Sequence, residues 1–140
     1  MSNFNGTARS NYFRVKNAEA FVEAMLALPG VGVWTKTGED GVVRHAVSSE
    51  DCDTGTWPTT GYNDETDEEI EYDMPTEIAP HLMDGEVCVL MEAGAEKLRY
   101  ISGWAVAFDN TDRPCVYVSL GDIYAKAEEA FGAKPTEAIY

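Results

Sequence analysis

The sequence predicts an α+β fold, a single domain with a largely antiparallel sheet of five to seven strands and two main helices on one face. Three observations lead to this fold class. Short segments alternate apolar and polar residues, two longer segments repeat apolar residues at helical spacing, and turn-forming residues separate them. The length of 140 residues suits one domain with its own core. We therefore expect a single domain over residues 1–140, with flexible ends at 1–10 and 133–140.

The first half of the chain predicts a strand, a helix and a hairpin. Residues 12–16 alternate apolar and basic side chains, which is typical of a half-buried strand. Asn17 is placed to cap a helix that ends before Pro29-Gly30. The apolar stripe of this helix is Phe21, Val22, Met25, Leu26 and Leu28. Strands over 31–35 and 42–47 follow, and a four-residue turn joins them.

Further strands are expected in the second half. An apolar run over 86–92 predicts a central strand, and the small residues 93–96 predict a turn after it. Residues 98–108 predict a long strand in which Gly103 marks a bulge. Residues 114–118 predict another strand.

Two helical segments complete the expected fold. Residues 75–82 predict a short helix or turn, since Pro80 prevents a long one. The closing helix should begin at Ser119, with Asp122 completing a capping box, and end at Gly132. Its expected buried stripe is Leu120, Ile123, Tyr124, Ala127 and Phe131.

The charge of the chain is concentrated in one central segment. The net charge is −15, and residues 39–92 hold sixteen acids and one base, whereas the rest of the chain holds nine of each. No Lys or Arg occurs between Arg44 and Lys97. Such a segment repels itself, so we expect bound cations, a basic partner or solvation to compensate. The negative charge disfavours direct binding to nucleic acid or to an anionic membrane.

The most acidic stretch, residues 50–73, divides into two parts. Residues 48–66 predict an acidic loop, rich in Gly, Thr and Pro, in which Trp57 and Tyr62 either anchor the loop on the core or serve as contacts in a binding patch. Residues 67–74 alternate in a way that predicts a strand with one carboxylate face. That face comprises Asp67, Glu69, Glu71 and Asp73.

These carboxylates raise the hypothesis of nucleic-acid mimicry. Alternate residues of a strand lie ~6.6 Å apart on one face, whereas one DNA strand carries a charge every ~3.4 Å. The strand needs the loop carboxylates beside it to approach the charge density of DNA. The predicted partner-binding residues are Asp51, Asp53, Trp57, Tyr62, Asp64, Glu65, Asp67, Glu69, Glu71 and Asp73. The alternative is a solvated acidic face that only promotes solubility.

Catalytic motifs are few. His45 and His81 are the only histidines and lie in no recognisable catalytic pattern, although a pair of Cys52 with His45 stays an alternative. The sequence contains no Walker loop, GxGxxG, HExxH or GxSxG motif. We therefore predict that the protein is not an enzyme and has no cofactor, with a small hydrolase using either histidine as an alternative.

A metal site is the other alternative considered. Residues 51–55 begin like a calcium loop, but the glycine comes one position early and Tyr62 stands where the loop needs Glu. We predict no metal site, and a cation-binding accessory domain is the second hypothesis. The three cysteines form no CxxC pair, and Cys88 and Cys115 lie in apolar runs that predict buried thiols. The N-terminus lacks a signal-like pattern and no apolar run reaches ~18 residues, so we expect a cytoplasmic protein.

Several fold-forming stretches resemble small acidic proteins encoded by phages and plasmids. They are GTARSNYFRVK at 6–16, EIAPHL at 77–82, GEVCVLME at 85–92 and EKLRYISGWAVA at 96–107. Acidic proteins of mobile elements include anti-restriction and anti-CRISPR inhibitors, several of which occupy a DNA-binding channel. The resemblance implies a non-enzymatic inhibitor of a host nucleic-acid-binding defence complex. Its partner would be a basic host protein or ribonucleoprotein, and the sequence leaves the oligomeric state open.

Overall fold

The computed structural model describes residues 4–50, 55–96 and 100–138. The strands are β1 (Phe4–Ser10), β2 (Val31–Thr37), β3 (Val43–Ser49), β4 (Thr60–Asn63), β5 (Glu68–Glu71), β6 (Cys88–Glu96), β7 (Tyr100–Phe108) and β8 (Val116–Ser119). The helices are α1 (Ala18–Leu26), α2 (Met74–Ile78) with the 3-10 turn η1 (Ala79–His81), and α3 (Asp122–Phe131).

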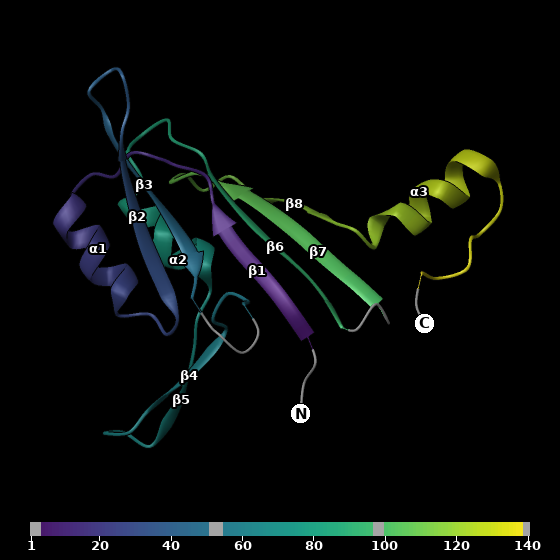
Figure 1. Ribbon diagram of the computed structural model, residues 1–140, viewed down its shortest axis with the longest axis horizontal. Coiled ribbons are helices and arrows are strands. Elements are labelled where there is room, and N and C mark those ends of the chain that lie inside the picture. Colours follow the sequence, from purple (N-terminus) through teal and green to yellow (C-terminus); the bar gives the residue numbers. More distant parts are fainter. Residues whose placement is uncertain (1–3, 51–54, 97–99, 139–140) are drawn as a thin grey trace.

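Six of these strands form one antiparallel sheet in the order β2-β3-β1-β6-β7-β8 (Figure 1). The other two, β4 and β5, form a separate hairpin. The α+β prediction is confirmed. None of the described helices is long and apolar enough to cross a membrane.

The first strand is β1, so the predictions of a flexible segment over 1–10 and of a first strand over 12–16 are wrong for the described residues. β1 lies in the middle of the sheet, paired with β6 along its whole length and with β3 at Arg9 and Ser48. Its residues are mostly small and polar, and the ladder hydrogen bonds on its two sides stabilise it in place of apolar side chains. Phe13, expected in a strand, makes only a single bridge to His45 and is buried.

The hydrophobic core lies between the sheet and the helices α1 and α2. Asn17 caps α1 as predicted, because its side chain accepts a hydrogen bond from the Ala20 amide. Phe21 is at the centre of the core, where its ring contacts the rings of Phe13, His45 and His81 at centroid distances of 5.6, 5.7 and 5.7 Å. Leu26 of the predicted stripe is exposed instead, whereas the other members are buried or half-buried.

Strand β6 extends further than expected, and β7 is more regular than expected. β6 continues through Glu96, so residues 93–96 do not form a turn. Gly103 pairs with Ala93 in an unbroken register, which excludes the predicted bulge. A Cβ atom at Gly103 would lie 3.0 Å from Leu120, so glycine here permits a close approach of the chain after β8.

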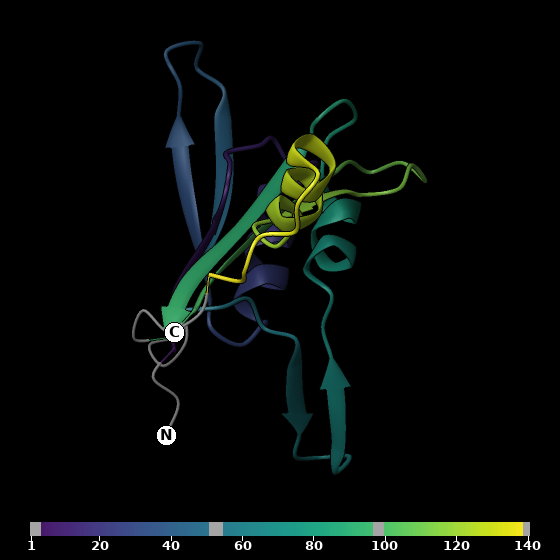
Figure 2. The ribbon, with the colours of Figure 1, turned by 90° about the vertical axis from the view of Figure 1, so that its right-hand side faces the viewer.

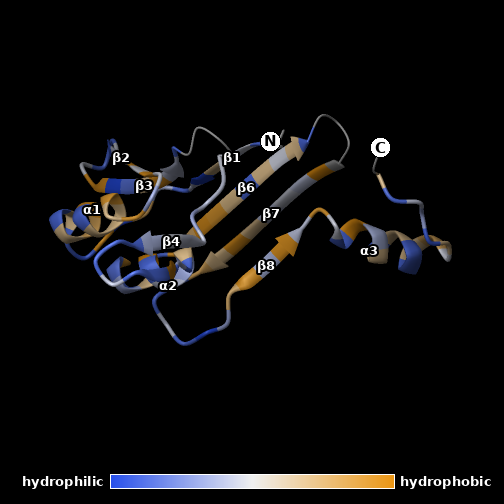
Figure 3. Cartoon of the chain, turned by 90° about the horizontal axis from the view of Figure 1, so that it is seen from below, coloured by the Kyte–Doolittle hydropathy of each residue, from blue (hydrophilic) through white to orange (hydrophobic). Residues whose placement is uncertain are grey.

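The last helix departs most from expectation. Ser119 and Asp122 do interact as a cap, since Asp122 accepts a hydrogen bond from the Ser119 amide at 2.9 Å, and Gly132 ends the helix with a φ of 70°. However, α3 buries no residue and extends away from the sheet (Figures 1 and 3). The two helices that cover one face of the sheet are therefore α1 and α2, and the predicted stripe of α3 is uncovered.

Candidate protein-binding site

The acidic segment forms the hairpin β4–β5, which projects from the body of the domain (Figures 1 and 2). Tyr62 pairs with Glu69 and Thr60 pairs with Glu71, so these four side chains share one face of the hairpin. All four are exposed, and the Tyr62 side chain is 58% exposed. The hairpin therefore presents a tyrosine beside two carboxylates to solvent.

The predicted row of four carboxylates is wrong, because the strand is shorter at both ends. Asp67 lies in the turn with a φ of 58°, a left-handed conformation that aspartate tolerates. The side chain of Asn63 closes this turn by accepting a hydrogen bond from the Glu65 amide at 2.9 Å. Asp73 caps α2 by accepting a hydrogen bond from the Thr76 amide at 3.3 Å. The row contains Glu69 and Glu71 alone.

The turn nevertheless adds further carboxylates to the hairpin. The exposed acidic residues of the hairpin are Asp64, Glu65, Asp67, Glu68, Glu69 and Glu71. Three of them, Glu68, Glu69 and Glu71, lie in the paired part of the hairpin, and Asp64, Glu65 and Asp67 lie in the turn. None of these six carboxylates forms an ion pair within the described part of the chain. The charges form a cluster around the tip of the hairpin, not a line along one face.

The predicted loop over 48–66 is shorter than expected, since β3 reaches Ser49 and β4 begins at Thr60. Its described part is docked on the sheet. Gly55 adopts a φ of 67°, and a Cβ atom there would lie 1.9 Å from the carbonyl oxygen of Gly6 in β1. Only glycine permits this close contact between the loop and β1. Trp57, 4% exposed, then fills the core.

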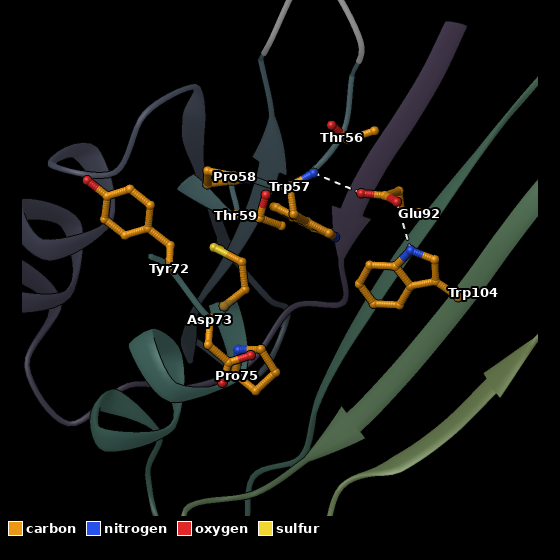
Figure 4. Close-up of a pocket in the computed structure, with 10 residues that line it drawn as sticks. Thr56, Trp57, Pro58, Thr59, Tyr72, Asp73, Pro75, Glu92 and Trp104 are labelled. Atoms are coloured by element: carbon orange, nitrogen blue, oxygen red, sulfur yellow. Dashed lines mark hydrogen bonds between the residues drawn. The ribbon is translucent and has the colours of Figure 1, made fainter. Parts of the chain in front are cut away.

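Glu92 of β6 holds this loop in place (Figure 4). Its carboxylate accepts one hydrogen bond from the Trp57 amide at 2.9 Å and another from Trp104 Nε1 at 2.7 Å. The indole nitrogen of Trp57 is buried and has no hydrogen-bond partner among the described residues. Of the two aromatics singled out in the sequence, Trp57 is thus an anchor in the core and Tyr62 is a surface residue.

A pocket of about 370 Å³ lies at the base of the hairpin (Figure 4). It is lined by Thr56, Trp57, Pro58, Thr59, Tyr72, Asp73, Met74, Pro75, Glu92 and Trp104. Aromatic rings and carboxylates around one recess suit a cationic side chain such as lysine or arginine. The pocket thus combines aromatic rings with the carboxylates of Asp73 and Glu92, both of which also accept hydrogen bonds from the chain.

The sequence pointed to Asp73 and Trp57 in this pocket, but not to Glu92 or Trp104. The alternation of β6 contained the signal, because Cys88 and Leu90 face the core and Glu92 is next in that series. A carboxylate at a core-facing position requires hydrogen-bond donors.

Some of the candidate metal-binding and catalytic residues of the sequence analysis lie outside the part of the chain that the structure describes. Asp51, Cys52 and Asp53 lie outside the described residues, so the calcium-like segment and the Cys52–His45 pair have no structural counterpart to compare. In residues 4–50, 55–96 and 100–138, no group of three or more His, Cys, Asp or Glu side chains is arranged to hold a metal ion.

His45 and the two described cysteines have distinct environments. His45 is buried, its Nδ1 lies 3.1 Å from Thr35 Oγ1, and burial lowers its pKa below the ordinary value. Cys88 is buried as predicted, and burial raises its thiol pKa. Cys115 is exposed, so its predicted burial is wrong. It lies just before the edge strand β8, where no element covers it.

The chain matches no protein-family model, and neither a curated protein nor a solved structure is significantly similar to it.

Proposed function

We propose that this protein is a non-enzymatic inhibitor that binds a basic, nucleic-acid-binding surface of a host defence complex through the β4–β5 hairpin. The observation that supports this most is the cluster of six exposed carboxylates on a projecting hairpin, none of them paired with a cation in the described chain. The resemblance to small acidic phage and plasmid proteins favours a defence complex as the target.

The charge cluster costs stability unless something compensates for it, because like charges in one place repel each other. A basic groove that normally holds a nucleic-acid backbone offers cations that can compensate for this charge. Complementary fields of this kind also accelerate association and select against acidic partners. Binding of such a partner is thus the use that best accounts for the cluster.

Tyr62 and the basal pocket would add contacts that charge alone does not supply. Tyr62 is exposed beside Glu69, and tyrosines in the middle of an interface often carry much of the affinity. The pocket lined by Trp57, Tyr72 and Trp104 would accept a lysine or arginine side chain from the partner. Affinity would then combine screened charge attraction with a smaller contribution that is insensitive to salt.

The test is a tagged pull-down from a host lysate, eluted with rising salt and identified by mass spectrometry. The hairpin variant E68K/E69K/E71K should lose the partner, and the wild-type complex should dissociate steeply with salt. The matched control is E19K/E23K/E39K, which changes the net charge equally at exposed sites on α1 and the β2–β3 turn. Duplex DNA added to the lysate should displace the partner from the wild-type protein.

The proposal is wrong if the hairpin and control variants retain the same partners. Elution that ignores salt, or a partner that binds duplex DNA and this protein together, also contradicts it.

A further inference from the structure

Helix α3 is amphipathic, and yet no other helix or strand of the described structure packs against it; only the tail returns to it, where the Ala138 amide donates a hydrogen bond to the Tyr124 hydroxyl at 2.7 Å. At about 100° per residue, its apolar residues form one stripe, in which Ile123 and Phe131 are 60% and 83% exposed. Leu120, just before the helix, is 55% exposed. Isolated helices shorter than about 12–15 residues are marginal in water, and α3 has 10 residues. A packing surface is therefore required for α3 to be stable.

The uncovered face of the sheet is a surface of the matching kind. The side chains of β6, β7 and β8 that point away from the core are Val89, Met91, Ala93, Ala95, Ile101, Gly103, Ala105, Ala107, Val116 and Val118. None is charged, and no described helix covers them. Figure 3 shows this apolar character along β6, β7, β8 and the start of α3.

A shallow trough runs along this face. It has a volume of about 270 Å³, with small residues Ala93, Gly103 and Ala105 between the larger Met91 and Val118, and Leu120 of the same chain also lines it. Small residues let a helix approach a sheet closely, and flanking larger side chains then pack against its sides. The trough thus fits an apolar helix stripe.

The α3 helix is directed away from the trough of its own chain. The Leu120 amide donates to the Gly103 carbonyl at 2.8 Å, and Asp122 holds the Ser119 amide, so the entry into the helix is fixed on both sides. In this direction the stripe of α3 points away from the sheet of its own chain, and a second copy can cover it without a change at the entry to the helix.

The solvent-accessible surface of the chain is large enough to include a dimer interface. The chain exposes 9656 Å², whereas a compact monomer of this length exposes about 7,200 Å². Part of the excess belongs to the projecting hairpins, but a standard interface needs only about 800 Å² from each partner. The edge strand β8, with three exposed apolar residues and no charge, adds to the surface that two copies can bury.

We propose that this chain forms a symmetric dimer in which α3 of each copy packs on the open β6–β7–β8 face of the other. The contact is isologous, so both unpaired surfaces are covered at once. Repulsion between the acidic hairpins of the two copies does not oppose this contact, because the hairpin lies at the far end of the molecule from α3 (Figures 1 and 3). Each dimer leaves both hairpins exposed. The dimer does not depend on the proposed inhibitor function.

The experiment is light scattering coupled to size exclusion, with sedimentation equilibrium up to about 100 μM, well above the Kd expected for a standard interface. The wild-type chain should have twice the mass of one chain. I123E/F131E should be monomeric, with dimer affinity lower by on the order of 100-fold or more because two apolar side chains are lost from the contact. A125E/K126Q makes the same net charge change on the polar side of α3 and should remain dimeric.

The second variant, Met91→Glu, changes the trough without touching the helix and should also give monomers. Circular dichroism of each variant verifies that the domain is folded. A wild-type chain that is monomeric overturns the proposal. If the wild-type chain is monomeric and I123E/F131E also lowers the free energy of unfolding, α3 packs on the sheet of its own chain, and the proposal is wrong as well. A dimer that survives both I123E/F131E and Met91→Glu also overturns it.

Discussion

The carboxylate of Glu92 accepts a hydrogen bond from Trp104 Nε1 across the β6–β7 ladder, where the two residues stand directly opposite each other. Its second oxygen accepts from the Trp57 amide. One side chain thus joins the loop before the acidic hairpin to the sheet. The position of the hairpin depends on this link, because Trp57 is only three residues from the start of β4.

Replacing Glu92 by alanine should lower the free energy of unfolding by about 2–4 kcal/mol. Hydrogen bonds to a charged group contribute about 1.5–3 kcal/mol each, and two that share a carboxylate are not fully additive. Glu92→Gln keeps one acceptor and should lose about half as much. Urea denaturation measures both, with the exposed Glu69→Ala as control, expected within about 0.5 kcal/mol of wild type. If E92A and E69A have the same free energy of unfolding, the two hydrogen bonds of Glu92 do not stabilise the fold.

Asp73 should affect stability through its cap and not through its charge. Asp73→Ala removes the acceptor for the Thr76 amide and should cost about 1 kcal/mol, or about 3 °C in Tm for a domain of this size. Asp73→Asn keeps an acceptor at the same place, so its Tm should stay near that of wild type. Thermal unfolding followed by circular dichroism distinguishes the two. If Asp73→Asn lowers the Tm as much as Asp73→Ala does, the charge of Asp73 contributes to stability.

Elements with local signals were predictable from the sequence. The start of α1 follows from Asn17, and the β2–β3 hairpin follows from alternation on both sides of a glycine-containing turn. β1 had no such signal, because Phe4–Ser10 is polar and small and is held by two neighbouring strands that are distant in sequence. Non-local pairing of this kind leaves little trace in composition.

The acidic hairpin was predictable in part. Alternation from residue 67 onward indicated a strand, but the same pattern could not show that Asn63 and Asp73 would end it early by bonding to the backbone. The stripe of α3 correctly predicted an amphipathic helix. Amphipathicity indicates that a helix packs on something, and it does not identify which surface.

The exposed cysteine should react with thiol reagents faster than the buried one. In a Cys52→Ser background, Cys115 should react with a thiol reagent within the mixing time of a native sample, whereas Cys88 should react only at the rate of unfolding. Burial raises the Cys88 pKa, so it holds little reactive thiolate at neutral pH. Cys115→Ser in the same background should remove the fast phase. Two fast thiols per chain in the folded Cys52→Ser protein would contradict the burial of Cys88.

Stability should decrease as the pH falls from 7.5 to 5.5, and His45 should account for the decrease. Burial lowers the pKa of His45 in the folded state, so the unfolded chain takes up a proton first, starting near pH 6.5. The stabilisation is complete above that pH and is lost as the pH falls toward the folded pKa, with a slope of at most about 1.4 kcal/mol per pH unit. Two side chains beside the His45 ring, Thr35 and Phe21, carry no charge that would raise the pKa of His45 again.

This pH range lies above the titration of Asp40, Glu86 and Asp109, since their pKa values are lowered from the ordinary values by hydrogen bonds to their carboxylates. Urea midpoints at each pH measure the slope. His45→Gln, which keeps a polar group for Thr35, should flatten it. If His45→Gln retains the full slope, another group carries the pH dependence and the neutral, buried state of His45 is not its source.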